Sequence, residues 1–199
     1  TNPTIDELRF ALKQFVQNIG KETERGLVFY YSGHSQTLTL KNSQKVGWII
    51  PKDAPLLEEN RRKFMEKAIS TEAISTMVDQ IQSKHVLFLF DASFSTDKFH
   101  VEPTILKIVN DASALPAHQF ITAGHADEPI SEESDFKRFL LQGLRGEADI
   151  IHDGVVSGSE LGLYISNRVS KVTGERLHPQ FGRLVLPGNA IGDFIFRLT

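Results

Sequence analysis

The sequence feature that most constrains the fold is the stretch from His85 to Thr96, His-Val-Leu-Phe-Leu-Phe-Asp-Ala-Ser-Phe-Ser-Thr. Five consecutive apolar residues, Val86 to Phe90, lead directly into Asp91 and, two residues later, Ser93. An apolar run of this length, followed by small and polar residues, is typical of a strand that is buried on both faces of a sheet. Side chains alternate along a strand, so Asp91 and Ser93 point the same way if the strand continues that far. In open α/β sheets, functional sites lie at this carboxyl end of the strands.

Short apolar runs alternate with amphipathic segments along the rest of the chain. The predicted strands cover residues 27–31, 86–90, 118–123 and 194–198, with a small hairpin at 37–50. The predicted helices cover residues 4–19, 71–81, 131–144 and 159–172, with a short one at 105–109, while residues 52–68 are predicted to be a solvent-exposed excursion. Strands that alternate with helices favour a mainly parallel sheet with helices on its faces. The sequence therefore predicts a single α/β domain over residues 1–199.

Composition narrows the class of protein. The 199 residues are 40% hydrophobic and 24% charged, which is typical of a soluble globular domain with a sizeable core. A net charge of −3 argues against a nucleic-acid or membrane-surface partner, and no apolar run approaches the length of a membrane span. The chain has no cysteine, so disulfides and thiolate metal sites are excluded. These features predict a cytoplasmic protein without nucleic-acid or membrane partners.

Two of the predicted strands end in reactive side chains. Residues 27–31 lead into Ser32-Gly-His34, and residues 86–90 lead to Ser93. If these strands are parallel neighbours, His34 and Ser93 lie at one edge of the sheet and could form a nucleophile–base dyad. The pattern alone also fits a structural Gly-His loop, because Ser93 lacks the Gly-x-Ser-x-Gly elbow of α/β hydrolases and the remaining histidines show no metal-ligand spacing.

Paired motifs give a more specific reading. Tyr-Tyr-Ser-Gly-His at residues 30–34 is followed about sixty residues later by Asp-Ala-Ser-Phe-Ser at 91–95. This pair resembles the caspase/metacaspase cysteine peptidases, whose motifs are Tyr-Tyr-Ser-Gly-His-Gly and Asp-Ala-Cys-Phe-Ser-Gly. The resemblance covers nearly the whole chain and is closest to bacterial metacaspase-like members. It continues through residues 47–54, 121–124, 143–149 and 179–182.

The resemblance implies a fold, an activity and a set of site residues. The fold would be a caspase-like three-layer α/β/α domain, and the activity would be cysteine-type endopeptidase cleavage after Arg or Lys in a protein or peptide substrate, without a cofactor. His34 would be the catalytic histidine and Ser93 would occupy the nucleophile position. Asp91 and Ser32 would line the pocket for the basic side chain. The backbone N–H groups of Ser35 and Ser93 would hold the oxyanion.

Three substitutions depart from the family pattern. Ser93 stands where the family has cysteine, and a serine hydroxyl needs a well-placed base that a third group orients. The resemblance therefore implies that activity is absent or very weak. Ser35 and Thr96 replace family glycines, and Ser35 would be strained if its position requires a glycine backbone. Ser93 is either an engineered replacement of cysteine or the mark of a natural pseudo-peptidase that binds or regulates, with a true serine peptidase as a third reading.

The family fold normally begins with a strand, a helix and a second strand that would precede residue 1. The chain is therefore predicted to be a fragment of a longer polypeptide, which could carry additional domains, and its sheet is predicted to have an exposed strand edge.

One loop bears on metal binding. Residues 149–160 approximate an EF-hand calcium loop, with Gly154 at the turn and Glu160 at the last position. The third position holds Ile151 instead of Asp or Asn, and Ser157 to Glu160 also reads as a helix capping box. No metal site is therefore assigned, and calcium remains an alternative.

Overall fold

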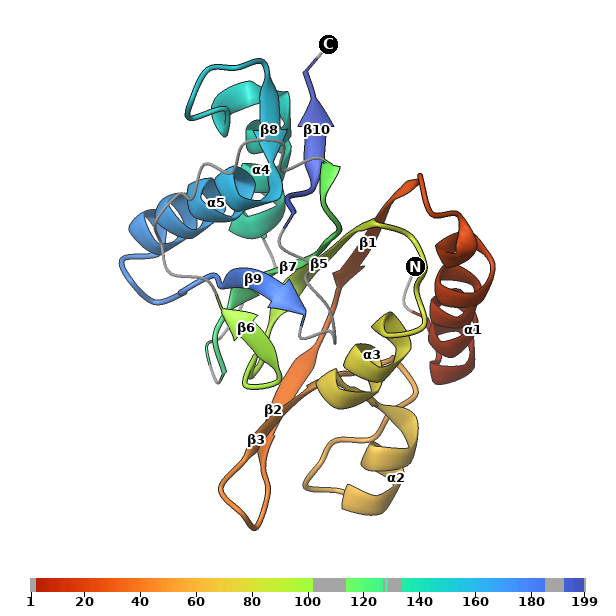
Figure 1. Cartoon of the computed structure of the whole chain (residues 1–199). Coiled ribbons are helices and arrows are strands. Elements are labelled where there is room, and N and C mark those ends of the chain that lie inside the picture. Colours follow the sequence, from red (N-terminus) through yellow and green to blue (C-terminus); the bar gives the residue numbers. More distant parts are fainter. Residues whose placement is uncertain (1–2, 102–113, 127, 129–133, 185–191, 199) are drawn as a thin grey trace.

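A five-stranded sheet forms the centre of the molecule (Figure 1). The computed structural model describes residues 3–101, 114–126, 128, 134–184 and 192–198. The strand order is β1-β5-β7-β9-β6, with bounds Gly26–Ser32, His85–Ser93, Ala117–Gly124, Phe181–Leu184 and Phe99–Val101. Strands β1, β5 and β7 are parallel, whereas β9 runs antiparallel to β7 and β6 runs antiparallel to β9. The predicted mixed α/β fold with a mainly parallel sheet is confirmed.

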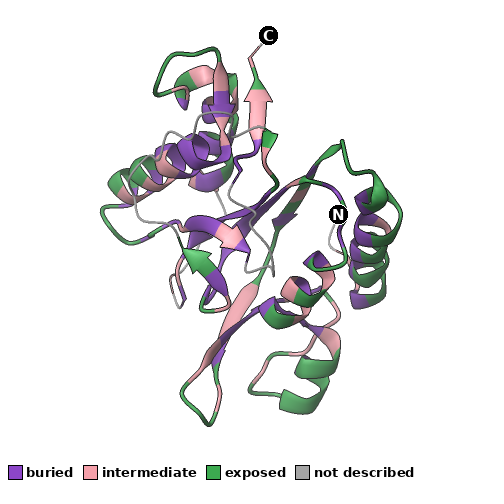
Figure 2. Cartoon of the chain, viewed as in Figure 1, coloured by how far each residue is buried: buried purple, intermediate pink, exposed green. Residues whose placement is uncertain are grey.

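Helices cover both faces of this sheet (Figures 1 and 2). The four main helices are α1 (Ile5–Gln17), α3 (Thr71–Val78), α4 (Asp135–Gln142) and α5 (Gly158–Val172). Helices α1 and α3 share one core cluster with Phe88 and Phe90 of β5. Helices α4 and α5 share a second cluster with Leu87 and Leu89, which point to the opposite face of the same strand. The alternation along β5 therefore places its side chains in two cores, as its continuous apolar sequence predicted.

The helices begin where capping residues lie in the sequence. Thr4 caps α1 and Ser157 caps α5, each in a capping box with the glutamate three residues later. Ser70 caps α3 by accepting a hydrogen bond from the N–H of Ala73. After α1, residues Ile19–Lys21 form a short 3-10 turn. The α-helix therefore ends at Gln17, close to the predicted end at residue 19.

Two small sheets flank the central one. Strands β2 (Ser35–Thr39), β3 (Lys45–Ile49) and β4 (Ile69–Ser70) form the first, which confirms the predicted hairpin. The expectation that residues 52–68 are a solvent-exposed excursion is wrong in part, because helix α2 (Arg61–Lys67) lies there and Phe64 is fully buried. The Phe64 ring packs against Trp48 with centroids 5.7 Å apart. Phe64 thus anchors this charged helix in the cluster formed with Leu38, Val46 and Trp48 of the hairpin.

Short strands near the C-terminus were not predicted as the structure has them. Strand β8 (Val155–Ser157) pairs with β10 (Ile195–Arg197) in a separate two-stranded sheet, so the predicted last strand exists but lies outside the central sheet. Neither β9 nor β6 was predicted. The predicted helix at 105–109 lies outside the described residues, as does the predicted start of the helix at 131–133. Residues Gly143–Glu147 form a π turn after α4.

Strand β1 is an open edge of the central sheet. In the part of the chain that the structure describes, β5 is the strand that pairs with it, and no strand pairs on its other side. Val28 and Tyr30 are 43% and 42% exposed, and the α4–α5 core cluster includes no residue of β1. The predicted exposed strand edge is therefore present.

Candidate active site

The carboxyl ends of β1 and β5 bring the two reactive segments together. The strands are parallel and in continuous register, with Gly26 opposite His85 and Ser32 opposite Asp91. Beyond the last pair, the hydroxyl of Ser35 donates a hydrogen bond to the backbone carbonyl of Ser93, at 2.7 Å. The segments that carry His34 and Ser93 are thus joined directly, as parallel neighbours require.

The side chains of His34 and Ser93 are not joined in the same way. The loop is fixed by the backbone carbonyl of His34, which accepts hydrogen bonds from the Tyr31 hydroxyl (2.8 Å) and the Ile50 N–H (2.9 Å). The His34 residue itself is exposed, whereas Ser93 Oγ is buried and has no hydrogen-bond partner among the described residues. Ser93 Oγ lies against Gly124 of β7, where any side chain would collide with it. The arrangement places a potential nucleophile and base close in the fold without assembling a hydrogen-bonded dyad.

Asp91 is the most heavily hydrogen-bonded of the predicted site residues. Its Oδ2 accepts hydrogen bonds from the hydroxyls of Ser134 (2.6 Å), Tyr30 (2.9 Å) and Ser32 (3.4 Å), while Oδ1 is buried with no partner in the described part of the chain. Burial, with a smaller contribution from Asp91, raises the pKa of Tyr30 to about 12, so its hydroxyl remains a donor at neutral pH. The structure therefore brings the predicted pair Asp91 and Ser32 together and adds Tyr30 and Ser134 to it.

Removing the Ser134 hydroxyl should destabilise the protein. Ser134 caps α4 by accepting a hydrogen bond from the N–H of Lys137 (2.9 Å), and the same hydroxyl donates to Asp91. We expect Ser134→Ala to lower the free energy of unfolding by about 2 kcal/mol, because it removes both a helix cap and a donor to a buried carboxyl group. Urea unfolding measures the loss. Ser134→Thr retains the hydroxyl and should keep most of the stability, and equal losses in the two variants would contradict this role.

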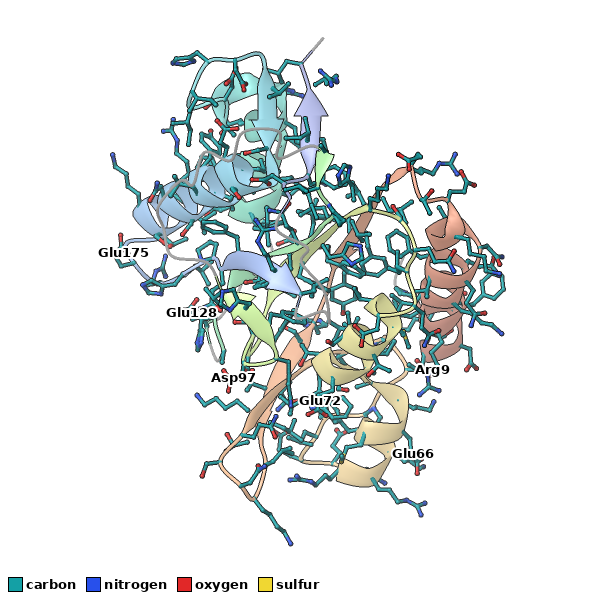
Figure 3. The ribbon with its side chains drawn as sticks, in the orientation of Figure 1. Arg9, Glu66, Glu72, Asp97, Glu128 and Glu175 are labelled. Atoms are coloured by element: carbon teal, nitrogen blue, oxygen red, sulfur yellow. The ribbon has the colours of Figure 1, made fainter. Side chains whose placement is uncertain are left out.

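Glu128 is a site residue that sequence reasoning missed. A Cβ atom placed on Gly124 would collide with both Glu128 Oε2 and Ser93 Oγ. The Glu128 carboxyl group therefore lies near Ser93. Oε2 accepts hydrogen bonds from the N–H groups of His125 and His178, each at 2.8 Å, and Oε1 lies 2.7 Å from Nδ1 of His178. Glu128 and Glu175 lie on the same side of the molecule (Figure 3), and the Nε2 of His178 is 3.7 Å from Glu175.

The ionised form of Glu128 is favoured by these contacts. Burial works in the opposite direction, but the two N–H donors and the His178 ring outweigh it and hold the pKa of Glu128 below its usual range. A carboxyl group whose pKa is lower in the folded state contributes stability above its unfolded pKa, about 4.3, and loses that contribution as the pH falls through the folded value.

Glu128 should therefore make stability depend on pH. We expect Glu128→Gln to lower the urea midpoint at pH 7 and to differ less from the unsubstituted chain at pH 3, because the contribution of the ionised carboxyl group is lost as the pH falls through its folded pKa. Urea titrations at a series of pH values measure the gap. Glu175→Gln is the control, because its carboxyl group is exposed and farther from His178. A gap that stays constant down to pH 3 would overturn the assignment.

Ser35 and Thr96, which differ from the glycines of the resembled motifs, fit their positions without backbone strain. Ser35 begins β2, and neither Ser35 nor Thr96 has a positive φ. The Thr96 hydroxyl is hydrogen-bonded to the Gln180 side chain. The strain considered for Ser35 is therefore absent.

The EF-hand-like loop is closed by its own hydrogen bonds. Asp149 accepts from the N–H groups of Asp153 and Gly154, each at 3.1 Å. The Glu160 carboxyl group accepts from Ser157 and from the N–H of Ile150. Among the described residues, no group of three or more His, Cys, Asp or Glu side chains could hold a metal ion. The capping box predicted for Ser157 and Glu160 is confirmed.

Comparisons with known proteins add no family assignment. No protein-family model matches the chain, and a search of curated proteins returns no match. None of the helices in the described residues is both long enough and apolar enough to cross a membrane.

Proposed function

We propose that this chain is a caspase-like domain whose parent activity is cysteine-type endopeptidase cleavage after Arg or Lys. The observation that carries the proposal is the pairing of Ser32 with Asp91 in the parallel strands, continued by the hydrogen bond from Ser35 to the Ser93 carbonyl. It puts both sequence motifs at one carboxyl edge of the sheet. The same proposal includes a protein or peptide partner, a cytoplasmic location and no cofactor, with calcium as the alternative.

Each site residue would have a defined task with cysteine at position 93. The thiolate sulfur would attack the scissile carbonyl carbon, and the carbonyl oxygen would become an oxyanion held by the N–H groups of residues 35 and 93. His34 would protonate the departing amine, and water would then hydrolyse the thioester. Asp91, positioned by the hydroxyls of Tyr30 and Ser134, would attract the basic side chain before the cleaved bond.

The unsubstituted chain, with Ser93, should have little or no peptidase activity. The hydroxyl of Ser93 needs a base within hydrogen-bond reach, and its Oγ has no such partner. Serine also lacks the low pKa that gives cysteine a thiolate near neutral pH. This observation favours the second candidate function, a pseudo-peptidase that uses the fold to bind a protein partner or to regulate.

Hydrolysis of Arg- and Lys-terminated peptide reporters by Ser93→Cys tests the proposal. Cleavage that disappears when His34→Ala is added supports the peptidase parentage. A folded Ser93→Cys variant that cleaves neither the Arg nor the Lys reporter would contradict the peptidase proposal and leave the binding function as the proposal.

A further inference from the structure

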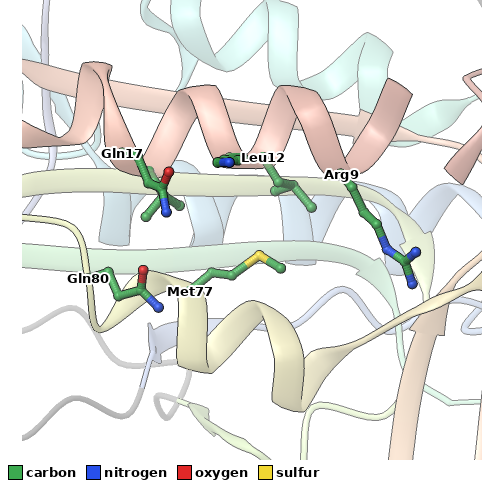
Figure 4. Close-up of a pocket in the computed structure, with 7 residues that line it drawn as sticks. Arg9, Leu12, Gln17, Met77 and Gln80 are labelled. Carbon is green, nitrogen blue, oxygen red and sulfur yellow. The ribbon is translucent and has the colours of Figure 1, made fainter. Parts of the chain in front are cut away.

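Helices α1 and α3 flank a groove that belongs to no part of the candidate active site (Figure 4). Its volume is about 320 Å³, and both helices pack on the sheet face opposite α4 and α5. Leu12 and Val16 of α1 and Met77 of α3 form its apolar lining. Leu12 and Val16 are buried and Met77 is half-buried. The floor of the groove is therefore firm on the α1 side and adaptable at the flexible methionine.

Polar side chains border this apolar lining. Arg9 and Lys13 lie four residues apart on α1, and Gln17 and Gln80 complete the lining. Figure 4 shows Arg9 at one end of the groove and the two glutamines facing each other across the other end. The groove thus has an arginine at one end, an apolar middle and an amide end.

The two basic side chains of α1 that border the groove can hold an anion. One N–H of Arg9 donates to the backbone carbonyl of Glu66 at 2.8 Å, which holds the guanidinium in place and leaves its other donors for a ligand. Lys13 has no ion-pair partner among the described residues. Two like charges four residues apart on a helix repel each other, and an anion between them relieves that repulsion.

We propose that this groove binds a small amphipathic anion, an alkyl or aryl carboxylate. The apolar body of the ligand contacts Leu12, Val16 and Met77, and its carboxylate accepts hydrogen bonds from Arg9 and Lys13. The volume is at the lower end of the range for small-molecule sites, so it fits one short chain or ring and not the face of a partner helix. The inference does not depend on the peptidase proposal, because the groove and the strand ends are separate.

Titration of the whole chain with sodium octanoate, followed by calorimetry, tests the inference. Octyltrimethylammonium has the same chain and the opposite charge, and should bind more weakly, by up to about fivefold. Lys13→Glu should weaken octanoate binding by up to about fivefold, whereas Lys171→Glu, at an exposed lysine of α5, should leave it unchanged. Gln80→Trp, at an exposed position, should fill the groove and abolish binding.

Four results would overturn the inference. The first two are that the unsubstituted chain does not bind octanoate, or that it binds octanoate and octyltrimethylammonium equally well. The other two are that Lys13→Glu and Lys171→Glu have equal effects, or that Gln80→Trp binds octanoate as well as the unsubstituted chain does. Capture of an acidic helical peptide without octanoate binding would also overturn it, because it would show a macromolecular occupant.

Discussion

Replacing Ser93 by cysteine is expected to raise the cleavage of Arg or Lys peptide reporters at least about 100-fold, because the nucleophile gains an accessible thiolate. Ser93 Oγ has no hydrogen-bonded base among the described residues, so nothing in that part of the structure assists the loss of its proton. Sulfur needs less help, since a few per cent of a free thiol is ionised at pH 7. The measurement is the initial rate of fluorophore release from Arg, Lys and Asp reporters at equal concentration.

The same experiment has a matched control. His34→Ala added to Ser93→Cys should reduce the rate at least about 100-fold, because general acid–base catalysis typically contributes that much. His34 is exposed, so its replacement should leave the fold intact. Equal rates with and without His34 would show that the new thiol reacts without a dyad.

The second large effect is expected in stability. Phe90→Ala should lower the free energy of unfolding by about 3–5 kcal/mol, because it empties a closely packed aromatic site. Phe90 is fully buried in β5, and its ring centroid lies 5.1 Å from that of Phe94 and 5.9 Å from that of Phe88. Such a loss is a large share of the roughly 5–15 kcal/mol that stabilises a typical domain.

Chemical unfolding in urea measures this loss. Val28→Ala is the control, since Val28 lies on the neighbouring edge strand and is 43% exposed. It should cost less than about 1 kcal/mol, as surface substitutions do. A similar cost for both variants would contradict the placement of Phe90 at the centre of the core.

The elements that could be predicted are those with strong local signals. The run from Val86 to Phe90 is continuous and apolar because both faces of β5 are buried. The capping boxes at Thr4 and Ser157 give helix starts to within a residue, because the cap is a local set of hydrogen bonds. Such signals need no knowledge of the rest of the chain.

The elements that were missed are defined by distant partners. Strand β9 is four residues long and forms only because β7 and β6 lie on either side of it. Strand β8 exists through its pairing with β10, forty residues away in the chain. The burial of Phe64 likewise depends on Trp48 in the hairpin. The charged residues next to Phe64 in the sequence therefore led to the wrong prediction that this segment is exposed to solvent.

The candidate site likewise has parts that the sequence predicts and parts that depend on distant partners. Paired motifs placed Ser32, His34, Asp91 and Ser93 on two strand ends, and the strand register supports that placement. Ser134 reaches Asp91 from the start of α4, and nothing in its own sequence neighbourhood signals this. Side-chain direction was also beyond the sequence, because the burial of Ser93 Oγ depends on the close approach of Gly124 in β7.

Covalent labelling of Ser93→Cys tests the central claim most directly. The chain contains no cysteine, so the new thiol is the only one and intact-mass spectrometry reads its modification without ambiguity. The proposed site predicts a single adduct with an arginyl peptide chloromethyl ketone, formed at least about tenfold faster than with the aspartyl reagent and slowed by His34→Ala. The unsubstituted chain, which has Ser93 and no cysteine, serves as the blank. Equal rates with the two reagents, unaffected by His34→Ala, would contradict a caspase-like site with a basic-residue pocket.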